Sequence, residues 1–316
     1  MIAVVGATGN VGRKIVEILL HRGCKKLALL ASSRSKGMEL FGYGVEDVEN
    51  FDFTKCKIVL FATDSDISRQ YIPHARQAGC VVIDSSSAFR LHEDVPLIVP
   101  PVNGFLVGKH SLYSTANCLA SPLSVVLMPL HKKLEVKRVI VTTFQSTSGA
   151  GKEPMDELFS SSGKVLMGEA AEAKFFPRPI AFNVIPQVDK ICEDGFTGEE
   201  HKIAKEVQKI VSGDIAIAAT AVRVPVGVGH SMSVAIEFKK TFSIEDVKEI
   251  LREAPGVVLS EDYATPREIA GQDGVFVGRM RRDPTCENGL MLWLVSDNLR
   301  RGAALDAVEV AQLIGV

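Results

Sequence analysis

The chain has 316 residues, of which 46% are hydrophobic and 23% are charged, so it has the length of two domains and the composition of an ordinary globular protein. A formal net charge of -2 argues against a nucleic-acid partner, and no apolar run approaches the length of a membrane span. Six scattered cysteines without a C-x-x-C pair argue against a metal site or a disulfide framework and favour a reducing, cytoplasmic location.

The start of the chain predicts the opening of a dinucleotide-binding βαβ unit. Residues 2–5 form an apolar run typical of a buried strand, residues 11–21 have a helical pattern, and a G-x-x-G-x-x-G turn lies between them. Glycines in such a turn let the backbone approach a pyrophosphate held at the helix N-terminus. The predicted cofactor contacts in this turn are Gly6, Ala7, Thr8, Gly9, Asn10, Val11 and Gly12.

The second predicted strand, residues 27–31, leads to the position where NAD-binding chains usually place an acidic residue for the adenosine ribose. Here the chain has Ser33, Arg34 and Ser35 instead. A guanidinium among hydroxyls suits a 2′-phosphate, which an acidic side chain would repel. These residues favour NADP over NAD, the alternative being that Arg34 is a solvated loop residue.

The alternation continues with strands at 57–62 and 81–84 and a helix at 65–78 that Pro73 kinks or splits. Such alternation predicts a parallel, doubly wound sheet with ligands at the carboxyl ends of the strands. Residues 88–103 then form a long irregular connection. Within it, Arg90 is a candidate anion clamp or, equally, an exposed structural arginine.

Cys118 lies between a predicted strand, residues 111–115, and a predicted apolar-faced helix, residues 119–134, with Pro122 in its first turn. Unpaired N–H groups and the positive end of the helix dipole stabilise anions there, so the thiol becomes easier to ionise and more nucleophilic. The same donors could hold an oxyanion formed after attack on a carbonyl. The alternative is that Cys118 is a small buried hydrophobic residue.

The next strand, residues 136–144, is followed by Gln145, a neutral group that could orient a carbonyl. The Gly-Lys dipeptide shortly after it lacks the spacing of a phosphate-binding Walker loop. Residues 177–189 are irregular, and residues 197–211 predict a helix capped by Thr197. Glu199 and Lys202 share a face of that helix, as ordinary surface charge pairs also do.

Arg223 and His230 bound a glycine-containing loop between predicted strands at 215–224 and 231–238. The loop could place a guanidinium fork for a carboxylate beside a proton-transfer group, although His230 alone would be interpreted as structural. A helix at 243–252, strands at 275–282 and 289–295 and an amphipathic helix at 302–314 follow. This half is not in strict alternation, which predicts a largely antiparallel sheet with helices on one face.

Together these segments resemble the aspartate-β-semialdehyde dehydrogenase family over essentially the whole chain. Several motifs occurring in one order are more specific than any one of them. The matching motifs are GATGNVG, ASSRS, SSSAFR followed by DVPLIVPPVN, ANC, TFQSTSGAGK, FNVIPQVD, TGEEHK, RVPVGVGHSMSV and DNLRRGAAL.

The resemblance implies a role for each matching residue. Cys118 would be the nucleophile that forms a thioester, His230 the acid/base and Gln145 the residue that orients the acyl intermediate. Arg223 would bind the substrate α-carboxylate, and Glu199 its α-amino group. The implied phosphate-binding residues are Arg90, Asn117 and Lys202. The implied cofactor contacts beyond the first turn are Ser33, Arg34, Ser35, Ser148, Gly149 and Asn298.

The implied activity is NADP-dependent reduction of L-aspartyl-4-phosphate to L-aspartate 4-semialdehyde with release of phosphate, and the reverse oxidation. The implied architecture is a Rossmann-type NADP-binding domain, residues 1–120, completed by the C-terminal helix at 298–316. An α+β catalytic and dimerisation domain, residues 121–297, would support a homodimer or a dimer of dimers. Two departures from the family pattern are Leu119, where many relatives have a hydroxyl residue, and Pro101, where relatives often have an acidic one.

Two other functions remain open. An N-acetyl-γ-glutamyl-phosphate reductase shares the chemistry, but its substrate lacks the free α-ammonium group that Glu199 would bind. A non-catalytic regulator that senses NADP would have no use for Cys118 and His230.

Overall fold

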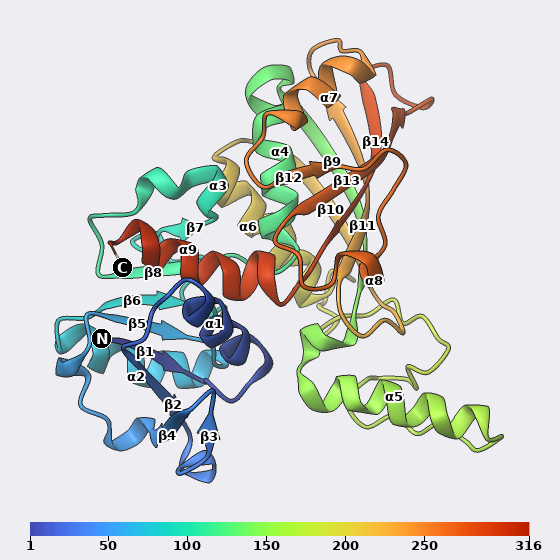
Figure 1. Cartoon of the computed structure of the whole chain (residues 1–316). Coiled ribbons are helices and arrows are strands. Elements are labelled where there is room, and N and C mark those ends of the chain that lie inside the picture. The colour runs from blue at the N-terminus through green and yellow to red at the C-terminus, as the bar shows by residue number, and fades with distance from the viewer. Residues whose placement is uncertain (316) are drawn as a thin grey trace. The chain divides into compact units, whose positions relative to one another are not determined.

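The computed structural model describes residues 1–315, and the internal contacts of the chain divide it into two compact units. The first unit consists of Met1–Asn117 together with the chain from Gly302 onward. The second unit is Cys118–Arg301. The chain therefore leaves the first unit after Asn117 and returns to it at Gly302 (Figure 1).

The first unit, as far as the chain is described, is built on an eight-stranded sheet in which every pairing is parallel except β3 with β4. In spatial order the strands are β3 (Glu39–Leu40), β4 (Tyr43–Asp47), β2 (Leu27–Ala31), β1 (Ile2–Val5), β5 (Ile58–Phe61), β6 (Val81–Asp84), β8 (Leu112–Thr115) and β7 (Leu97–Ile98). The predicted doubly wound parallel sheet is confirmed, with a short antiparallel hairpin added at one edge.

Both faces of this sheet are covered, as the continuous apolar runs of its strands require. Side chains of β1 alternate, so Ile2 and Val4 join one core and Ala3 and Val5 the other. The helices α1 (Asn10–His21) and α9 (Leu305–Leu313) cover the first face, and α2 (Ser65–Gln77) covers the second. The last helix therefore packs beside the first one (Figure 1).

One alternative and one expectation for this unit need correction. Pro73 does not split the second helix, because α2 is continuous from Ser65 to Gln77. The connection at 88–103 is not wholly irregular, since it contains β7 and the short helix α3 (Pro100–Asn103). Pro100 and Pro101 occupy the first turn of α3, where a missing N–H costs no hydrogen bond, which explains how Pro101 is accommodated.

The second unit has a six-stranded mixed sheet within the described residues. In spatial order its strands are β10 (Ala216–Arg223), β9 (Val136–Gln145), β11 (His230–Phe238), β14 (Gly289–Ser296), β13 (Val275–Arg282) and β12 (Val257–Leu259). The three inner pairings are antiparallel and the two outer ones are parallel. The sheet is thus largely antiparallel, as predicted, although β10 and β12 run parallel to their neighbours.

Helices α4 (Ala120–Leu134), α6 (Gly198–Val211) and α7 (Ile244–Arg252) cover one face of this sheet. The remaining helices are α5 (Lys152–Leu166) and α8 (Pro266–Ile269). On β9, Val139 and Val141 are buried beneath the helices, whereas Ile140 is 47% exposed on the opposite face. Short turns at Ser33–Ser35 and Thr147–Ala150 have 3-10 geometry, and Arg300–Ala304 forms a π-helical segment leading into α9.

The start of α6 is fixed by two side chains. Thr197 caps the helix as predicted, and with Glu200 it forms a capping box in which each side chain binds the backbone N–H of the other residue. The second oxygen of Glu200 accepts a hydrogen bond of 2.8 Å from the N–H of Ala221 in β10. Glu200 therefore ties the first turn of α6 to the strand that ends at Arg223. Between residues 1 and 315, no helix is both long and apolar enough to cross a membrane.

Candidate active site

Cys118 is partly buried in the turn between β8, which ends at Thr115, and α4, which begins at Ala120. Leu119 occupies the N-cap position of α4 and is fully buried, so it contributes packing where a hydroxyl residue would contribute a cap. The sulfur of Cys118 interacts electrostatically with the guanidinium of Arg223. A thiolate at this position would therefore be stabilised by a cation and by the helix N-terminus.

Arg223 is the last residue of β10 and lies opposite Gln145 in the β9–β10 register. Its Nη1 donates a 2.6 Å hydrogen bond to the carbonyl oxygen of Ser146, and its guanidinium lies 5.8 Å from the ring centroid of Phe176. Burial lowers the pKa of Arg223, while nearby Glu199 and Cys118 act in the opposite direction. An arginine side chain stays protonated even when burial lowers its pKa, so the site contains a buried cation.

Glu199 is buried in the first turn of α6 and accepts a 3.1 Å hydrogen bond from Nε2 of Gln145. This contact orients the Gln145 amide and joins residues 54 positions apart in the chain. Glu199 and Arg223 also interact electrostatically. A buried anion and a buried cation are thus placed together, which is complementary to a substrate that carries both an ammonium group and a carboxylate.

His230, the first residue of β11, is fully buried. Its Nδ1 accepts a 3.0 Å hydrogen bond from the N–H of Ser146, and the Ser146 hydroxyl oxygen lies 3.0 Å from the same nitrogen. Burial, reinforced by the neighbouring Arg223 cation, holds the pKa of His230 well below its ordinary value. The ring is therefore neutral with its proton on Nε2, an atom that has no hydrogen-bond partner within residues 1–315.

Asn298 and Ser148, both predicted cofactor contacts, lie in the hydrogen-bond network around this histidine. Oδ1 of Asn298 accepts from the N–H of Gly229 at 2.8 Å and from the hydroxyl of Ser146 at 3.0 Å. Its Nδ2 donates to the Ser148 hydroxyl at 3.1 Å. Gly149 also lies beside this ring, since a Cβ placed there would lie 3.0 Å from His230 Nε2. Their roles in cofactor binding stay predictions.

The predicted phosphate-binding residues do not fall within one unit. Lys202 belongs to the second unit, where its Nζ lies 2.6 Å from Asp189 and 3.9 Å from Glu199. Arg90 and Asn117 are buried in the first unit. Arg90 donates to the carbonyl oxygens of Thr115 and Ser85 at 2.9 and 2.7 Å, so part of its guanidinium joins the ends of β8 and β6.

The predicted nucleotide turn has the geometry that its glycines suggest. Gly6 has φ +81, and a Cβ there would lie 2.4 Å from the carbonyl oxygen of Ala62. A Cβ on Gly12 would lie 2.0 Å from the carbonyl oxygen of Gly6, so only glycine permits this close turn. α1 starts without a side-chain cap or an acidic first-turn residue, and Nδ2 of Asn10 is buried without a partner in the described chain. These uncommitted donors fit a pyrophosphate.

Ser33, Arg34 and Ser35 form a turn that directly follows β2, at the carboxyl edge of the parallel sheet. Ser33 and Arg34 are exposed and Ser35 is half-buried. A charged, solvent-accessible guanidinium at this edge is chemically suited to a phosphate group.

Three contacting residues lay outside the sequence-based prediction. Ser146 orients His230 through its backbone N–H, a group that every non-proline residue carries and that residue type does not signal. Phe176 reaches Arg223 from an irregular segment with no periodic pattern. Asp189, which pairs with Lys202, has φ +70, and Asp is one of the few residue types that adopt such a conformation with little strain.

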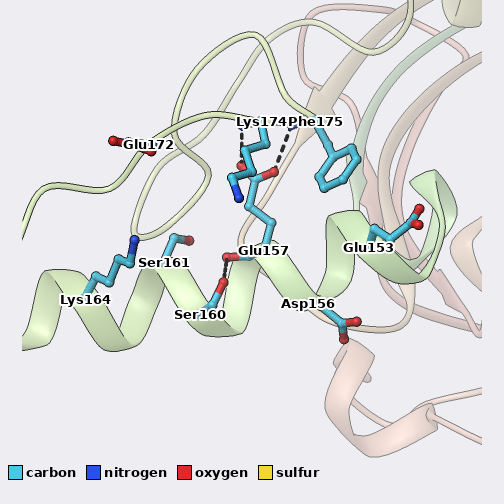
Figure 2. Close-up of a pocket in the computed structure, with 9 residues that line it drawn as sticks. All are labelled: Glu153, Asp156, Glu157, Ser160, Ser161, Lys164, Glu172, Lys174 and Phe175. Atoms are coloured by element: carbon cyan, nitrogen blue, oxygen red, sulfur yellow. Dashed lines mark hydrogen bonds between the residues drawn. The ribbon is translucent and has the colours of Figure 1, made fainter.

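A separate hollow of about 370 Å³ lies between α5 and the segment around Lys174, and none of the predicted site residues lines it. Figure 2 shows its wall, where the Glu157 carboxylate reaches the backbone N–H groups of Lys174 and Phe175. Glu157 thereby fastens this segment to the helix. The residues that line the hollow include no cysteine and no histidine, so it is not the candidate active site.

Comparisons with known proteins agree over the whole chain. Residues 1–109 match the family model described as semialdehyde dehydrogenase, NAD binding domain, and residues 127–301 match semialdehyde dehydrogenase, dimerisation domain. A relative in Rickettsia bellii named aspartate-semialdehyde dehydrogenase is 43% identical over 325 residues, covering 98% of this chain and 96% of the relative.

Solved structures give the same result. The aspartate semialdehyde dehydrogenase II of Vibrio cholerae, complexed with ASA, superposes with a TM-score of 0.96 at 39% identity, covering 99% of this chain and 97% of that one. The aspartate semialdehyde dehydrogenase of Candida albicans, solved with NADP, superposes with a TM-score of 0.76 at 25% identity, with the same coverage.

Proposed function

The chain belongs to the aspartate-semialdehyde dehydrogenase family, and from this we propose that it converts L-aspartyl-4-phosphate and NADPH to L-aspartate 4-semialdehyde, phosphate and NADP, and catalyses the reverse oxidation. The observation that carries the proposal is the grouping in one unit of Cys118, the neutral buried His230 and the buried Arg223–Glu199 pair. The product serves biosynthesis of lysine, threonine and methionine in the pathways typical of this family.

Substrate recognition rests on charge complementarity. The Arg223 guanidinium offers a planar fork to the α-carboxylate, and the Glu199 carboxylate is available to the α-ammonium group. Gln145, held by Glu199, would orient the acyl carbonyl. An N-acetylated substrate would leave the buried Glu199 charge without an ammonium partner, which disfavours the N-acetyl-γ-glutamyl-phosphate reductase alternative.

In the chemical step, the Cys118 thiolate would attack the acyl carbon and form a carbon–sulfur bond as the carbon–oxygen bond to phosphate breaks. Bound NADPH would supply the hydride that reduces the resulting thioester. Collapse of the thiohemiacetal would then expel the Cys118 thiolate and release the aldehyde. Arg223 and the α4 N-terminus stabilise that thiolate both before attack and after release.

His230 would act through Nε2, because its Nδ1 is occupied by the Ser146 N–H. The hydrogen on Nε2 can be donated to the substrate oxygen that becomes negative when the carbonyl carbon turns tetrahedral. The fixed tautomer means that this donor needs no reorientation during the reaction. Lys202, Arg90 and Asn117 would hold the phosphate, with Lys202 dividing its charge between phosphate and Asp189.

The decisive experiment is the Cys118→Ser variant, assayed for NADPH formation from the semialdehyde with and without inorganic phosphate. The parent should require phosphate, and the variant should lose activity by roughly three orders of magnitude or more, as other enzymes do without their covalent nucleophile. The matched control is Cys286→Ser, which removes another partly buried thiol. An undiminished rate in Cys118→Ser would rule out the thioester route, and NADPH binding without turnover by the parent would favour the regulator.

For the cofactor, we propose NADP, with the glycine turn holding the pyrophosphate and Arg34 holding the 2′-phosphate. The exposed guanidinium at the edge of β2 supports this choice, as does the NADP bound to the Candida relative. Changing Arg34 to Asp should weaken NADPH binding by about tenfold or more while leaving NADH binding less affected, because only NADPH carries the 2′-phosphate. Equal losses for the two cofactors, measured by fluorescence titration, would remove the case for 2′-phosphate recognition.

For assembly, we propose a homodimer, which could pair further into a dimer of dimers. Support comes from the match to a dimerisation domain and from the face of the second sheet opposite its helices, where Ile140 is exposed and Phe144 and Trp293 are half-buried. For location, we propose the cytoplasm, where the six free thiols would remain reduced.

A further inference from the structure

Beyond the candidate active site, three different metal-ligating side chains meet on the surface of the second unit. Sγ of Cys192, a carboxylate oxygen of Asp194 and a ring nitrogen of His201 all lie within 4.8 Å of one another. The proposed reaction uses none of them. We propose that Cys192, Asp194 and His201 form a Zn²⁺ site with water as the fourth ligand.

The backbone already holds the three residues in place. Cys192 and Asp194 lie in a tight turn closed by a 2.7 Å hydrogen bond from the Cys192 N–H to the Phe196 carbonyl and by the Ile191–Thr197 bridge. Gly195, at φ +84, allows the turn to close. His201 follows on the first turn of α6, whose start the Thr197–Glu200 capping box fixes. Little chain ordering would therefore be needed on metal binding.

The side chains are also oriented toward one another. One oxygen of Asp194 accepts a hydrogen bond from the Phe196 N–H, leaving the other oxygen 2.9 Å from His201 Nε2. The Phe196 ring lies 5.7 Å from the His201 ring and limits its rotation. Tetrahedral Zn²⁺ with metal–ligand distances of about 2.0–2.3 Å separates its ligand atoms by roughly 3.5 Å. Small rotations of the exposed Cys192 and Asp194 side chains and of the half-buried His201 ring would reach that spacing.

The donor set selects the class of ion. Ca²⁺ and Mg²⁺ bind six or more oxygen ligands, whereas this group offers one oxygen, one nitrogen and one sulfur. Thiolate, imidazole and carboxylate together suit Zn²⁺, and the two negative charges of Cys192 and Asp194 balance its charge. Because protons compete for the thiolate and the imidazole, the affinity should fall as the pH is lowered.

The test uses the full chain carrying Cys118→Ser, so that the candidate nucleophile cannot bind metal. After chelator treatment, titration calorimetry should give one Zn²⁺ per chain, and Co²⁺ substituted for it should produce a thiolate-to-metal charge-transfer band. Adding Cys192→Ser should abolish the band and weaken Zn²⁺ binding by more than about tenfold, since even supporting residues of metal sites contribute that much. His201→Gln should weaken binding comparably.

The matched control adds Cys286→Ser instead, which removes a different partly buried thiol and should leave binding unchanged. Circular dichroism would verify that each variant is folded. Unchanged Zn²⁺ affinity in the Cys192→Ser or His201→Gln protein, or a Co²⁺ spectrum without a sulfur band, would overturn the proposal. None of these measurements depends on dehydrogenase activity, so the proposed function can fail independently of this one.

Discussion

The charge of the buried Arg223 is stabilised by several neighbouring groups. It donates to the Ser146 carbonyl, lies over the Phe176 ring and interacts with the Glu199 carboxylate. A cation this desolvated binds a substrate carboxylate strongly, because little water remains to be displaced from it. Its planar fork also fixes the direction from which that carboxylate approaches.

Substituting Arg223→Lys tests this geometry. A lysine retains the charge but loses the bidentate fork and the stacking on Phe176, so we expect the KM for the semialdehyde to rise by about ten- to a hundredfold, with a smaller change in kcat. Steady-state kinetics with Arg252→Lys, an exposed position on α7, is the matched comparison. A change in kcat with no change in KM would assign Arg223 to the chemical step instead.

At this scale, sequence analysis identifies residues whose chemistry depends on side-chain type. Cys118 at a strand-to-helix turn and the Arg223–His230 pair around a glycine loop were predictable, and the structure places them in one unit. The contact between Ser146 and His230 was not predictable. It is made by the backbone N–H of Ser146, a group that is the same in every non-proline residue. The hydrogen bond between Gln145 and Glu199 depends on how distant segments of the chain pack together, which no local sequence pattern specifies.

The elements around His230 are packed so closely that one turn determines its position. The 3-10 turn Thr147–Ala150 follows β9, and a Cβ added to its Gly149 would lie 3.0 Å from His230 Nε2. Asn298 links this turn to the loop that ends at His230 through Ser148 and Gly229. Small displacements of the turn should therefore alter catalysis before they alter the fold.

The Gly149→Ala variant probes this packing. Its Cβ would lie 3.0 Å from His230 Nε2, so the ring must move by a few tenths of an ångström, and we expect kcat to fall by roughly tenfold. The control is Gly163→Ala in α5, where the new Cβ has no atom within 4 Å apart from its chain neighbours and the nearby backbone of its own helix. This change should leave kcat unaltered and stabilise the protein by about 0.5–1 kcal/mol. Equal kcat values for the two variants would contradict the close packing.

Strongly patterned elements were predictable, whereas weakly patterned ones were not. The continuous apolar runs of β1, β2 and β6 identified their strands to the residue. Helix α5 was missed because it buries only Pro154, Glu157, Leu158 and Ser161 and contains a Ser-Ser-Ser-Gly stretch that is typical of a loop. The β3–β4 hairpin was missed because β3 has two residues and Gly42 and Gly44 weaken the strand signal.

For the whole molecule, the burial of titratable groups links stability to pH. His230 stays neutral in the folded chain because its pKa lies well below the ordinary value, whereas the unfolded chain takes up a proton there below about pH 6.5. Acidification therefore favours unfolding. Asp84 acts in the opposite sense, since burial raises the pKa of its carboxyl and the folded state retains a proton that the unfolded state loses.

We expect the His230 contribution to be complete above about pH 6.5 and to be lost on acidification, with a slope of about 1.4 kcal/mol per pH unit until the folded pKa is reached. Trp293, the single tryptophan, lies in β14 and reports unfolding of the second unit by fluorescence. Urea unfolding between pH 5 and pH 7 should be less pH-dependent in His230→Gln than in the parent, while the exposed His21→Gln serves as the control. If the free energy of unfolding depended on pH equally in all three proteins, His230 would make no such contribution.

Domain class and the order of elements were readable from the sequence, because alternation of strands and helices gives way to runs of strands. The direction of the outer strands β10 and β12 could not be predicted from the sequence, since it depends on which neighbour each strand pairs with. The assignment of cofactor binding to one domain and catalysis to the other stays a prediction.

The first unit is assembled from two stretches separated by the whole of Cys118–Arg301. Helix α9 supplies Leu305 and Val308 to the core beside β1 and α1. On the ribosome, one side of the nascent sheet is therefore covered by α1 alone while the intervening stretch is translated. Chaperone protection should be needed longest at that side, and a nonsense mutation near the 3′ end of the message should be as damaging as an early one.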